Sequence, residues 1–112
     1  MLSKKNRITK KKDFERIFKK GTSFREQFLV LKVTLSPLQA SRFTFVVSRK
    51  VSKNAVVRNK IRRQLRELMR PQINEIKKRV DGVFIVLPGL ENKNFQEIKN
   101  ILNNLLKKTK LI

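Results

Sequence analysis

Residues 48–70 of the chain read SRKVSKNAVVRNKIRRQLRELMR, a basic stretch that contains a single acid, Glu67. From Asn54 onward its apolar residues recur at spacings of three and four, which predicts a helix with one buried stripe. The stripe consists of Val57, Ile61, Leu65, Leu68 and Met69. The basic side chains of this helix therefore point away from the core.

Four arginines follow one another on this helix at intervals of four residues: Arg58, Arg62, Arg66 and Arg70. They share one helix face, where each like-charge pair destabilises an isolated helix by roughly 0.2–0.5 kcal/mol. A polyanion reverses this cost, because neutralising its phosphates releases counterions. A solvated helix usually alternates Glu with Lys, whereas this one prefers Arg, whose planar guanidinium binds a phosphate with two hydrogen bonds. We therefore interpret the stretch as a nucleic-acid-binding helix with exposed contacts, and not as an ordinary solvated surface.

The composition is typical of one small basic domain, residues 1–112, in which residues 1–8 form a mobile basic arm. The chain has 29 Lys and Arg residues against 8 Asp and Glu, a formal net charge of +21, so nucleic acid and anionic membrane are the candidate partners. No apolar run approaches the ~18 residues that indicate a membrane span, and no signal peptide is recognisable. We expect a cytoplasmic protein with no membrane partner.

Residues that usually carry catalysis are scarce. The chain has no cysteine, histidine, tyrosine or tryptophan, which excludes disulfides, thiolate chemistry and histidine-based catalytic triads. Its carboxylates are scattered, and the closest two, Asp13 and Glu15, would point to different sides of a helix. We expect no catalytic residue and no recognisable metal site in the protein itself.

The first half of the chain is predicted to hold one helix and two strands. Residues 9–20 have helical apolar spacing and end at Gly21, a suitable C-cap. Residues 27–35 alternate as a strand with one apolar face and one mixed face. Residues 36–41 form a turn, and residues 42–48 form a second strand, which we expect to pair antiparallel with the first.

The segment after the basic helix contains a strong helix breaker, Pro71. We expect the helix to kink or restart there, because proline lacks the N–H of an interior position and disfavours helical geometry in the residue before it. Ile73, Ile76 and Val80 would then continue the apolar stripe in a second helical segment that begins at the proline. Residues 81–82, Asp-Gly, are typical of a turn.

The last third of the chain is predicted to hold a strand and a helix. Residues 83–87 are an unbroken apolar run, typical of a central strand covered on both faces. Asn94 and Glu97 have the spacing of a capping box, which precedes the clearest amphipathic stripe in the sequence. The order helix, strand, strand, helix, strand, helix predicts an α+β two-layer sandwich with three helices on a small mixed sheet. Spacing alone favours a right-handed crossover through the basic helix.

The basic stretch also resembles the signature of the bacterial ribonuclease P protein subunit, approximately S-(K/R)-K-x-G-x-A-V-x-R-N-x-x-(K/R)-R-x-x-R-E. The matching residues are Ser48, Arg49, Lys50, Ala55, Val56, Arg58, Asn59, Arg62, Arg63, Arg66 and Glu67. Lys53 stands where the family usually has glycine, and Lys60 where its arginine-asparagine-arginine core usually ends, so both departures keep or add charge. The resemblance implies a fold similar to a ribosomal-protein domain, with a left-handed crossover through the basic helix.

The resemblance further implies a function: assisting ribonuclease P in the endonucleolytic removal of the 5′ leader of precursor tRNA. Catalysis would then belong to the RNA subunit, which would also hold the Mg²⁺ ions, with one protein per RNA. The loop and basic helix would bind this catalytic RNA. The side chains expected to do so are Arg49, Lys50, Lys53, Arg58, Asn59, Lys60, Arg62, Arg63, Arg66 and Arg70.

A second site implied by the resemblance is a cleft between the first helix and the sheet, which would bind the single-stranded leader. The residues expected to line it are Lys10, Lys11, Lys12, Phe14, Phe18 and Lys32. Burial statistics alone place Phe14 and Phe18 in the core, whereas an aromatic side chain among lysines also suits base stacking. Family members commonly carry an aromatic residue late in the following strand, where this chain offers Leu31 or Lys32.

Two other functions fit parts of the sequence. One is a ribosomal or generic RNA-binding protein without enzymatic context. The other is a stand-alone nuclease that uses lysine or carboxylate chemistry. Stimulation of cleavage by ribonuclease P RNA distinguishes the first from a ribonuclease P subunit, and cleavage of precursor tRNA by the protein alone would indicate the second.

Overall fold

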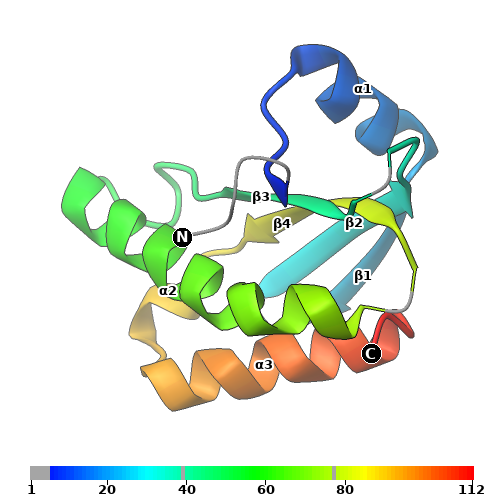
Figure 1. The fold of residues 1–112 in the computed structure, drawn as a ribbon. Helices are drawn as coiled ribbons and strands as arrows, with labels where there is room; N and C mark the ends of the chain where they lie inside the picture. The colour runs from blue at the N-terminus through cyan, green and yellow to red at the C-terminus, as the bar shows by residue number, and fades with distance from the viewer. Residues whose placement is uncertain (1–5, 39, 77) are drawn as a thin grey trace.

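The computed structural model describes residues 6–38, 40–76 and 78–112. Its helices and strands follow the order α1 (Lys11–Lys20), β1 (Thr22–Glu26), β2 (Leu29–Leu35), β3 (Arg42–Val46), α2 (Ala55–Gln72), β4 (Val80–Val86) and α3 (Phe95–Lys108). Short 3₁₀ helices, η2 (Ile73–Glu75) and η3 (Leu90–Asn92), follow α2 and β4. The predicted α+β sandwich of three helices on a mixed sheet is confirmed, with β1 as an additional strand (Figure 1).

The four strands lie in the order β1-β2-β4-β3. β2 pairs antiparallel with β1 and with β4, whereas β3 and β4 are parallel. The expected antiparallel pairing of the strands at residues 27–35 and 42–48 is therefore wrong, because β4 lies between them. β4 is apolar along most of its length and is covered on both faces, which suits the central position.

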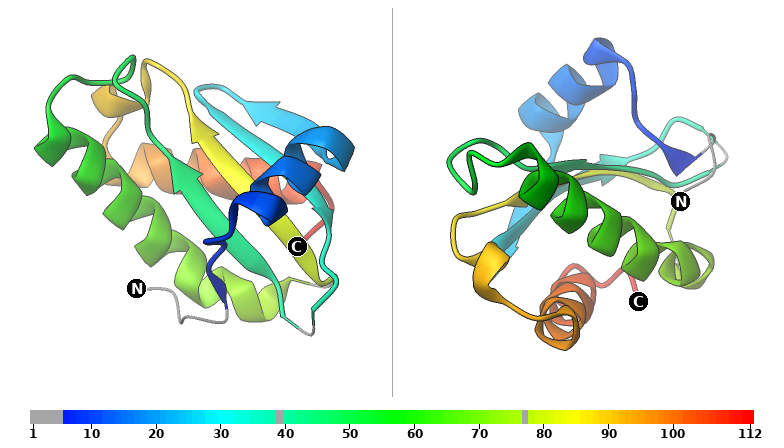
Figure 2. Two further views of the ribbon diagram at one scale, coloured as in Figure 1. Left: turned by 90° about the horizontal axis from the view of Figure 1, so that it is seen from above. Right: turned by 90° about the vertical axis from the view of Figure 1, so that its left-hand side faces the viewer.

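Helices cover both faces of the sheet. α2 and α3 lie against one face and α1 crosses the other (Figure 2). The larger core fills the space on the α2 and α3 side, where Phe45 stacks on Phe84 with ring centroids 5.4 Å apart. A smaller cluster of Ile8, Ile17 and Val83 lies on the α1 side.

β1 is the strand that the sequence pattern missed. It forms a hairpin with β2 through Gln27 and Phe28, and Gln27 adopts a positive φ of 50°. Residues 22–26 contain one apolar side chain, Phe24, so no alternating pattern is present. Glutamine is also not among the residues that usually indicate a tight turn.

The expected restart of the helix at Pro71 is wrong. α2 continues through Pro71 to Gln72, and the N–H of Ile73 donates to the carbonyl of Met69. The fixed φ of Pro71 suits a helix, and its missing N–H removes one intrahelical bond, the one to the carbonyl of Glu67. Val80 does not continue a helical stripe, since it is the first residue of β4.

Residues 81–82 are not a turn, because both lie inside β4. A Cβ atom on Gly82 would lie 2.9 Å from the Phe43 ring and 3.0 Å from Leu31 Cδ1. Gly82 is therefore needed for close packing between neighbouring strands. Gly21 does follow α1, and its N–H donates to the carbonyl of Ile17 at 2.8 Å, but its backbone is extended and not left-handed.

The capping box that begins α3 is confirmed. The Glu97 N–H donates to Asn94 Oδ1 at 2.8 Å, and the Asn94 N–H donates to Glu97 Oε1 at 3.0 Å. These two bonds satisfy backbone groups that the first turn of a helix leaves unpaired. The capped helix supplies five buried side chains to the larger core: Ile98, Ile101, Leu102, Leu105 and Leu106.

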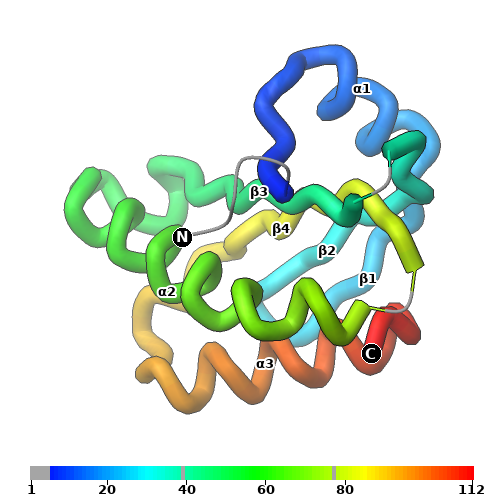
Figure 3. The backbone as a smooth tube through the Cα atoms, viewed as in Figure 1, coloured from blue at the N-terminus to red at the C-terminus, as the bar shows by residue number. Residues whose placement is uncertain are grey.

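Only part of the predicted mobile arm, residues 1–8, belongs to the described chain. Residues 1–5 lie outside the described part of the chain. The rest of the predicted arm, Asn6, Arg7 and Ile8, lies beside β3 (Figure 3). Asn6 Nδ2 donates to the carbonyl of Ser41 at 2.7 Å, Arg7 forms a parallel β-bridge with Phe43, and Ile8 is buried.

A cluster of four charged side chains fastens α1 to the sheet. Asp81 in β4 has no exposed surface, and Arg42 in β3 donates to its two carboxylate oxygens at 2.9 and 2.6 Å. Arg16 of α1 also donates to Asp81. Asp13 of α1 completes the cluster and lies 3.2 Å from Arg42.

Replacing Asp81 with Asn should lower the free energy of unfolding by about 3–5 kcal/mol, because it leaves the buried Arg42 without its main partner. Urea denaturation of both proteins measures this change. Glu75→Gln is the control, since Glu75 is exposed and its replacement should change stability by less than about 0.5 kcal/mol. Equal stability of the two variants would show that the cluster does not hold the fold together.

Asp13 should make the fold sensitive to acid. The hydrogen bond from Arg42 lowers the pKa of Asp13 below its ordinary value, against the opposing effect of burial. Its contribution to stability is therefore complete above the ordinary pKa and is lost as the pH falls through the lowered pKa. Between about pH 6 and about pH 3, the wild-type protein should lose more unfolding free energy than Asp13→Asn. Urea denaturation of both proteins at the two pH values measures these losses. Equal losses of unfolding free energy in the two proteins would contradict the prediction.

Candidate nucleic-acid interface

The apolar stripe of α2 packs in the larger core, so the basic side chains of the helix point away from that core. Ile61, Leu65, Leu68 and Met69 are buried against the sheet and α3, as predicted. The helix begins after Asn54, whose side chain accepts a hydrogen bond from the N–H of Val56 at 2.9 Å. This Asn cap satisfies one of the free N–H groups of the first turn.

The ten side chains expected to bind RNA fall into two groups. The exposed group consists of Arg49, Lys50, Lys53, Asn59, Lys60, Arg63 and Arg70. Arg58, Arg62 and Arg66 are half-buried, so the expectation that they are exposed is wrong for these three. They lie where the helix meets β3 and the loop that precedes the helix.

Two of the half-buried arginines fasten this loop. Arg58 donates to the carbonyl of Ser52 at 2.9 Å. Arg62 donates to the carbonyl of Val47 at 3.3 Å and to the side chain of Asn59. These bonds hold the loop and the helix as one surface, so less ordering is needed when a ligand binds.

The surface carries almost no compensating charge. In the part of the chain that the structure describes, Glu67 is the only acid that pairs with any of the ten side chains, through Arg70. The remaining positive charges therefore act together on a polyanion. Basic residues elsewhere are used differently, since Arg16 and Arg42 are bound to Asp81 inside the fold.

The second expected site lies on the opposite face of the sheet, beneath α1. Phe18 is 44% exposed, and Lys32 Nζ lies 5.2 Å from the centroid of its ring. Phe14 is half-buried and packs against the cluster of Ile8 and Ile17. The two phenylalanines therefore differ: Phe14 belongs partly to the core, and Phe18 presents its ring beside a cation.

The two alternatives in β2, Leu31 and Lys32, lie on opposite faces of the sheet, and Lys32 is the one that faces α1. Leu31 is fully buried on the α2 and α3 side, whereas Lys32 contacts Phe18 on the α1 side. Lys10 precedes α1 and Lys11 and Lys12 lie in its first turn, all three exposed. Lysines and one exposed aromatic ring thus occur on the same side of the sheet.

An α+β sandwich whose basic loop and helix pair with a single acid among the described residues is typical of a nucleic-acid-binding protein. A family model, Ribonuclease P, matches residues 2–110. The chain belongs to the ribonuclease P protein family. Membership gives it a role in processing the 5′ leader of tRNA and an RNA partner.

The individual proteins that this chain resembles are also ribonuclease P proteins. The ribonuclease P protein component of Pseudanabaena sp. is 36% identical, and the match covers 100% of this chain and 97% of that protein. The component of Bacillus velezensis is 35% identical, with 98% and 94% covered. The structure of the Staphylococcus aureus RNase P protein has a TM-score of 0.88 at 33% identity, with 95% of this chain and 96% of that chain covered. The Thermotoga maritima protein has a TM-score of 0.81 at 33% identity, with 91% and 96% covered.

The described helices include none that is both long enough and apolar enough to cross a membrane. The longest of them, α2, is the basic helix itself.

Replacing Arg58, Arg62 and Arg66 together with Ala should weaken binding to a bacterial ribonuclease P RNA and lower the slope of log affinity against log salt by about 2–3. Stability should also fall by about 1 kcal/mol for each lost bond to the loop carbonyls. Filter binding at several salt concentrations measures the slope. The control replaces three exposed lysines near the C-terminus with Ala: Lys99, Lys107 and Lys110. Equal losses in both variants would show that total charge, and not this surface, determines binding.

Proposed function

We propose that the loop and α2 bind the catalytic RNA of ribonuclease P, and that the α1 side of the sheet binds the 5′ leader of precursor tRNA. The observation that carries this proposal is the basic surface, where ten polar side chains on one loop and one helix meet a single pairing acid in the described residues. Such a surface gains free energy from each phosphate that it neutralises.

The protein contributes binding energy and not catalysis in this proposal. Its described residues bring together no group of three His, Cys, Asp or Glu side chains that could hold a metal ion. The Mg²⁺ ions that activate water and stabilise the leaving oxygen would therefore be held by the RNA subunit. We further propose one protein per RNA.

Leader binding would let the enzyme distinguish precursor from product. Phe18 offers part of its ring face, and Lys32 lies over that ring, so a base could stack beside a positive charge. Mature tRNA has no leader and would gain nothing from this contact. The discrimination would appear as tighter binding of precursor tRNA by the complete ribonucleoprotein.

Reconstitution with a bacterial ribonuclease P RNA at low Mg²⁺ tests the proposed function. The protein should increase cleavage of precursor tRNA at the mature 5′ end. Binding to ribosomal RNA without such stimulation would favour a generic RNA-binding protein. Cleavage by the protein alone would favour a stand-alone nuclease.

Phe18→Ala should lower the affinity of the reconstituted enzyme for precursor tRNA by about 1–3 kcal/mol, because a stacking contact is lost. Affinity for mature tRNA should not change. Stability should fall little, since Phe18 is already 44% exposed. Phe14→Ala is the comparison, because it should destabilise the smaller core by about 1–3 kcal/mol. Equal losses for precursor and mature tRNA with Phe18→Ala would rule out leader binding at this ring.

A further inference from the structure

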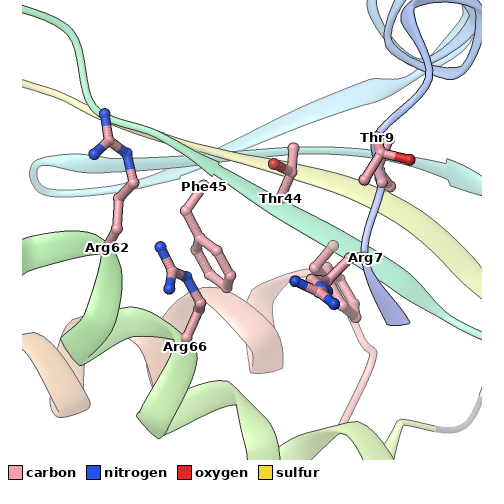
Figure 4. A pocket seen from close by; sticks show the side chains of 8 residues that line it. Arg7, Thr9, Thr44, Phe45, Arg62 and Arg66 are labelled. Carbon is pink, nitrogen blue, oxygen red and sulfur yellow. The ribbon is translucent and has the colours of Figure 1, made fainter. Parts of the chain in front are cut away.

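A hollow of about 260 Å³ lies between the N-terminal segment, the edge of β3 and α2. We call it the β3-edge hollow; its polar lining residues are Arg7, Thr9, Thr44, Arg62 and Arg66. Figure 4 shows Arg62 and Arg66 rising from α2 on one side of the Phe45 ring and Arg7 reaching in from the N-terminal segment on the other. Three arginines from two distant parts of the sequence thus surround one space.

The main chain of β3 also presents groups to this hollow. β3 is an edge strand, and the N–H of Ile8 donates to the carbonyl of Phe43 on its outer edge at 3.4 Å. Peptide groups of alternate residues in a strand point to the same side, so the N–H of Phe45 also points outward. No hydrogen bond between this N–H and another described residue closes that part of the edge.

The arginines of the hollow have no acidic partner among the described residues. Arg7 and Arg66 form no ion pair or hydrogen bond with the side chains that the structure describes, and Arg66 is half-buried. Arg62 donates to two neutral acceptors, the Val47 carbonyl and the Asn59 side chain. Like charges gathered in a half-enclosed space repel one another and favour an anion that several of them can contact.

We propose that the β3-edge hollow binds a phosphate group of RNA, held by the guanidinium groups of Arg7, Arg62 and Arg66 and by the N–H of Phe45. The Phe45 side chain is nearly buried, so the hollow offers no aromatic face for a base, and the phosphate is the group that fits its chemistry. The proposal rests on the proposed function, because RNA is the ligand. It extends the RNA-binding surface to Arg7, beyond the loop and α2.

Arg7→Gln and a matched control test this site. Lys99→Gln also removes one charge, but from the exposed face of α3 away from the hollow. Affinity of the full chain for a bacterial ribonuclease P RNA should fall about 5- to 10-fold with Arg7→Gln and less than about twofold with Lys99→Gln. Equal affinities of the two variants would overturn the site and leave the proposed function standing. Failure of the wild-type chain to bind this RNA would overturn the function and the site together.

The amide of Phe45 gives a local readout by NMR. A short oligouridylate should shift this amide, and the same oligomer with a neutral methylphosphonate backbone should not. Arg7→Gln should weaken the response to oligouridylate, whereas Lys99→Gln should preserve it. A shift with inorganic phosphate but not with oligouridylate would identify a free-anion site and overturn the proposal, as would a response that survives unchanged in Arg7→Gln.

Discussion

The buried carboxylate of Asp81 is the constraint on which the arrangement of both proposed RNA-binding faces depends. It lies on the central strand and receives bonds from Arg42 of β3 and Arg16 of α1. Asp81 therefore fixes the parallel pair of strands that α2 connects, and it fixes the position of α1 above the sheet. A chain with few acids uses one of them where no solvent reaches it, because a buried guanidinium requires an anionic partner.

The basic residues divide into internal and external roles. Arg16 and Arg42 neutralise Asp81, whereas Arg58 and Arg62 fasten the loop by donating to its carbonyl groups. Arginine suits this double role because its five N–H donors can bind a carbonyl with one edge and leave others for a ligand. The half-buried arginines thus connect the stability of the loop to the surface proposed to bind RNA.

The predictable parts of the structure were those set by local patterns. The apolar stripe of α2 and the capping box of α3 follow from spacing alone. The predictions are wrong where contacts between residues far apart in the sequence determine the structure. Gly82 suggested a turn but fits between Phe43 and Leu31, and β1 forms without an alternating pattern because β2 and α3 provide its partners. The β3-edge hollow joins Arg7 to Arg62 across the fold, a proximity that no local pattern contains.

The arginines at the outer edge of β3 also affect how copies of the protein interact when no RNA is bound. An open strand edge can pair with the edge of another molecule, which is a common route to aggregation. Two copies that approached through this edge would bring three arginines from each into one contact, with a net charge of +21 on each chain. The side chains that we propose to bind a phosphate would therefore keep free copies apart, and RNA bound there would cover the edge as it neutralises their charge.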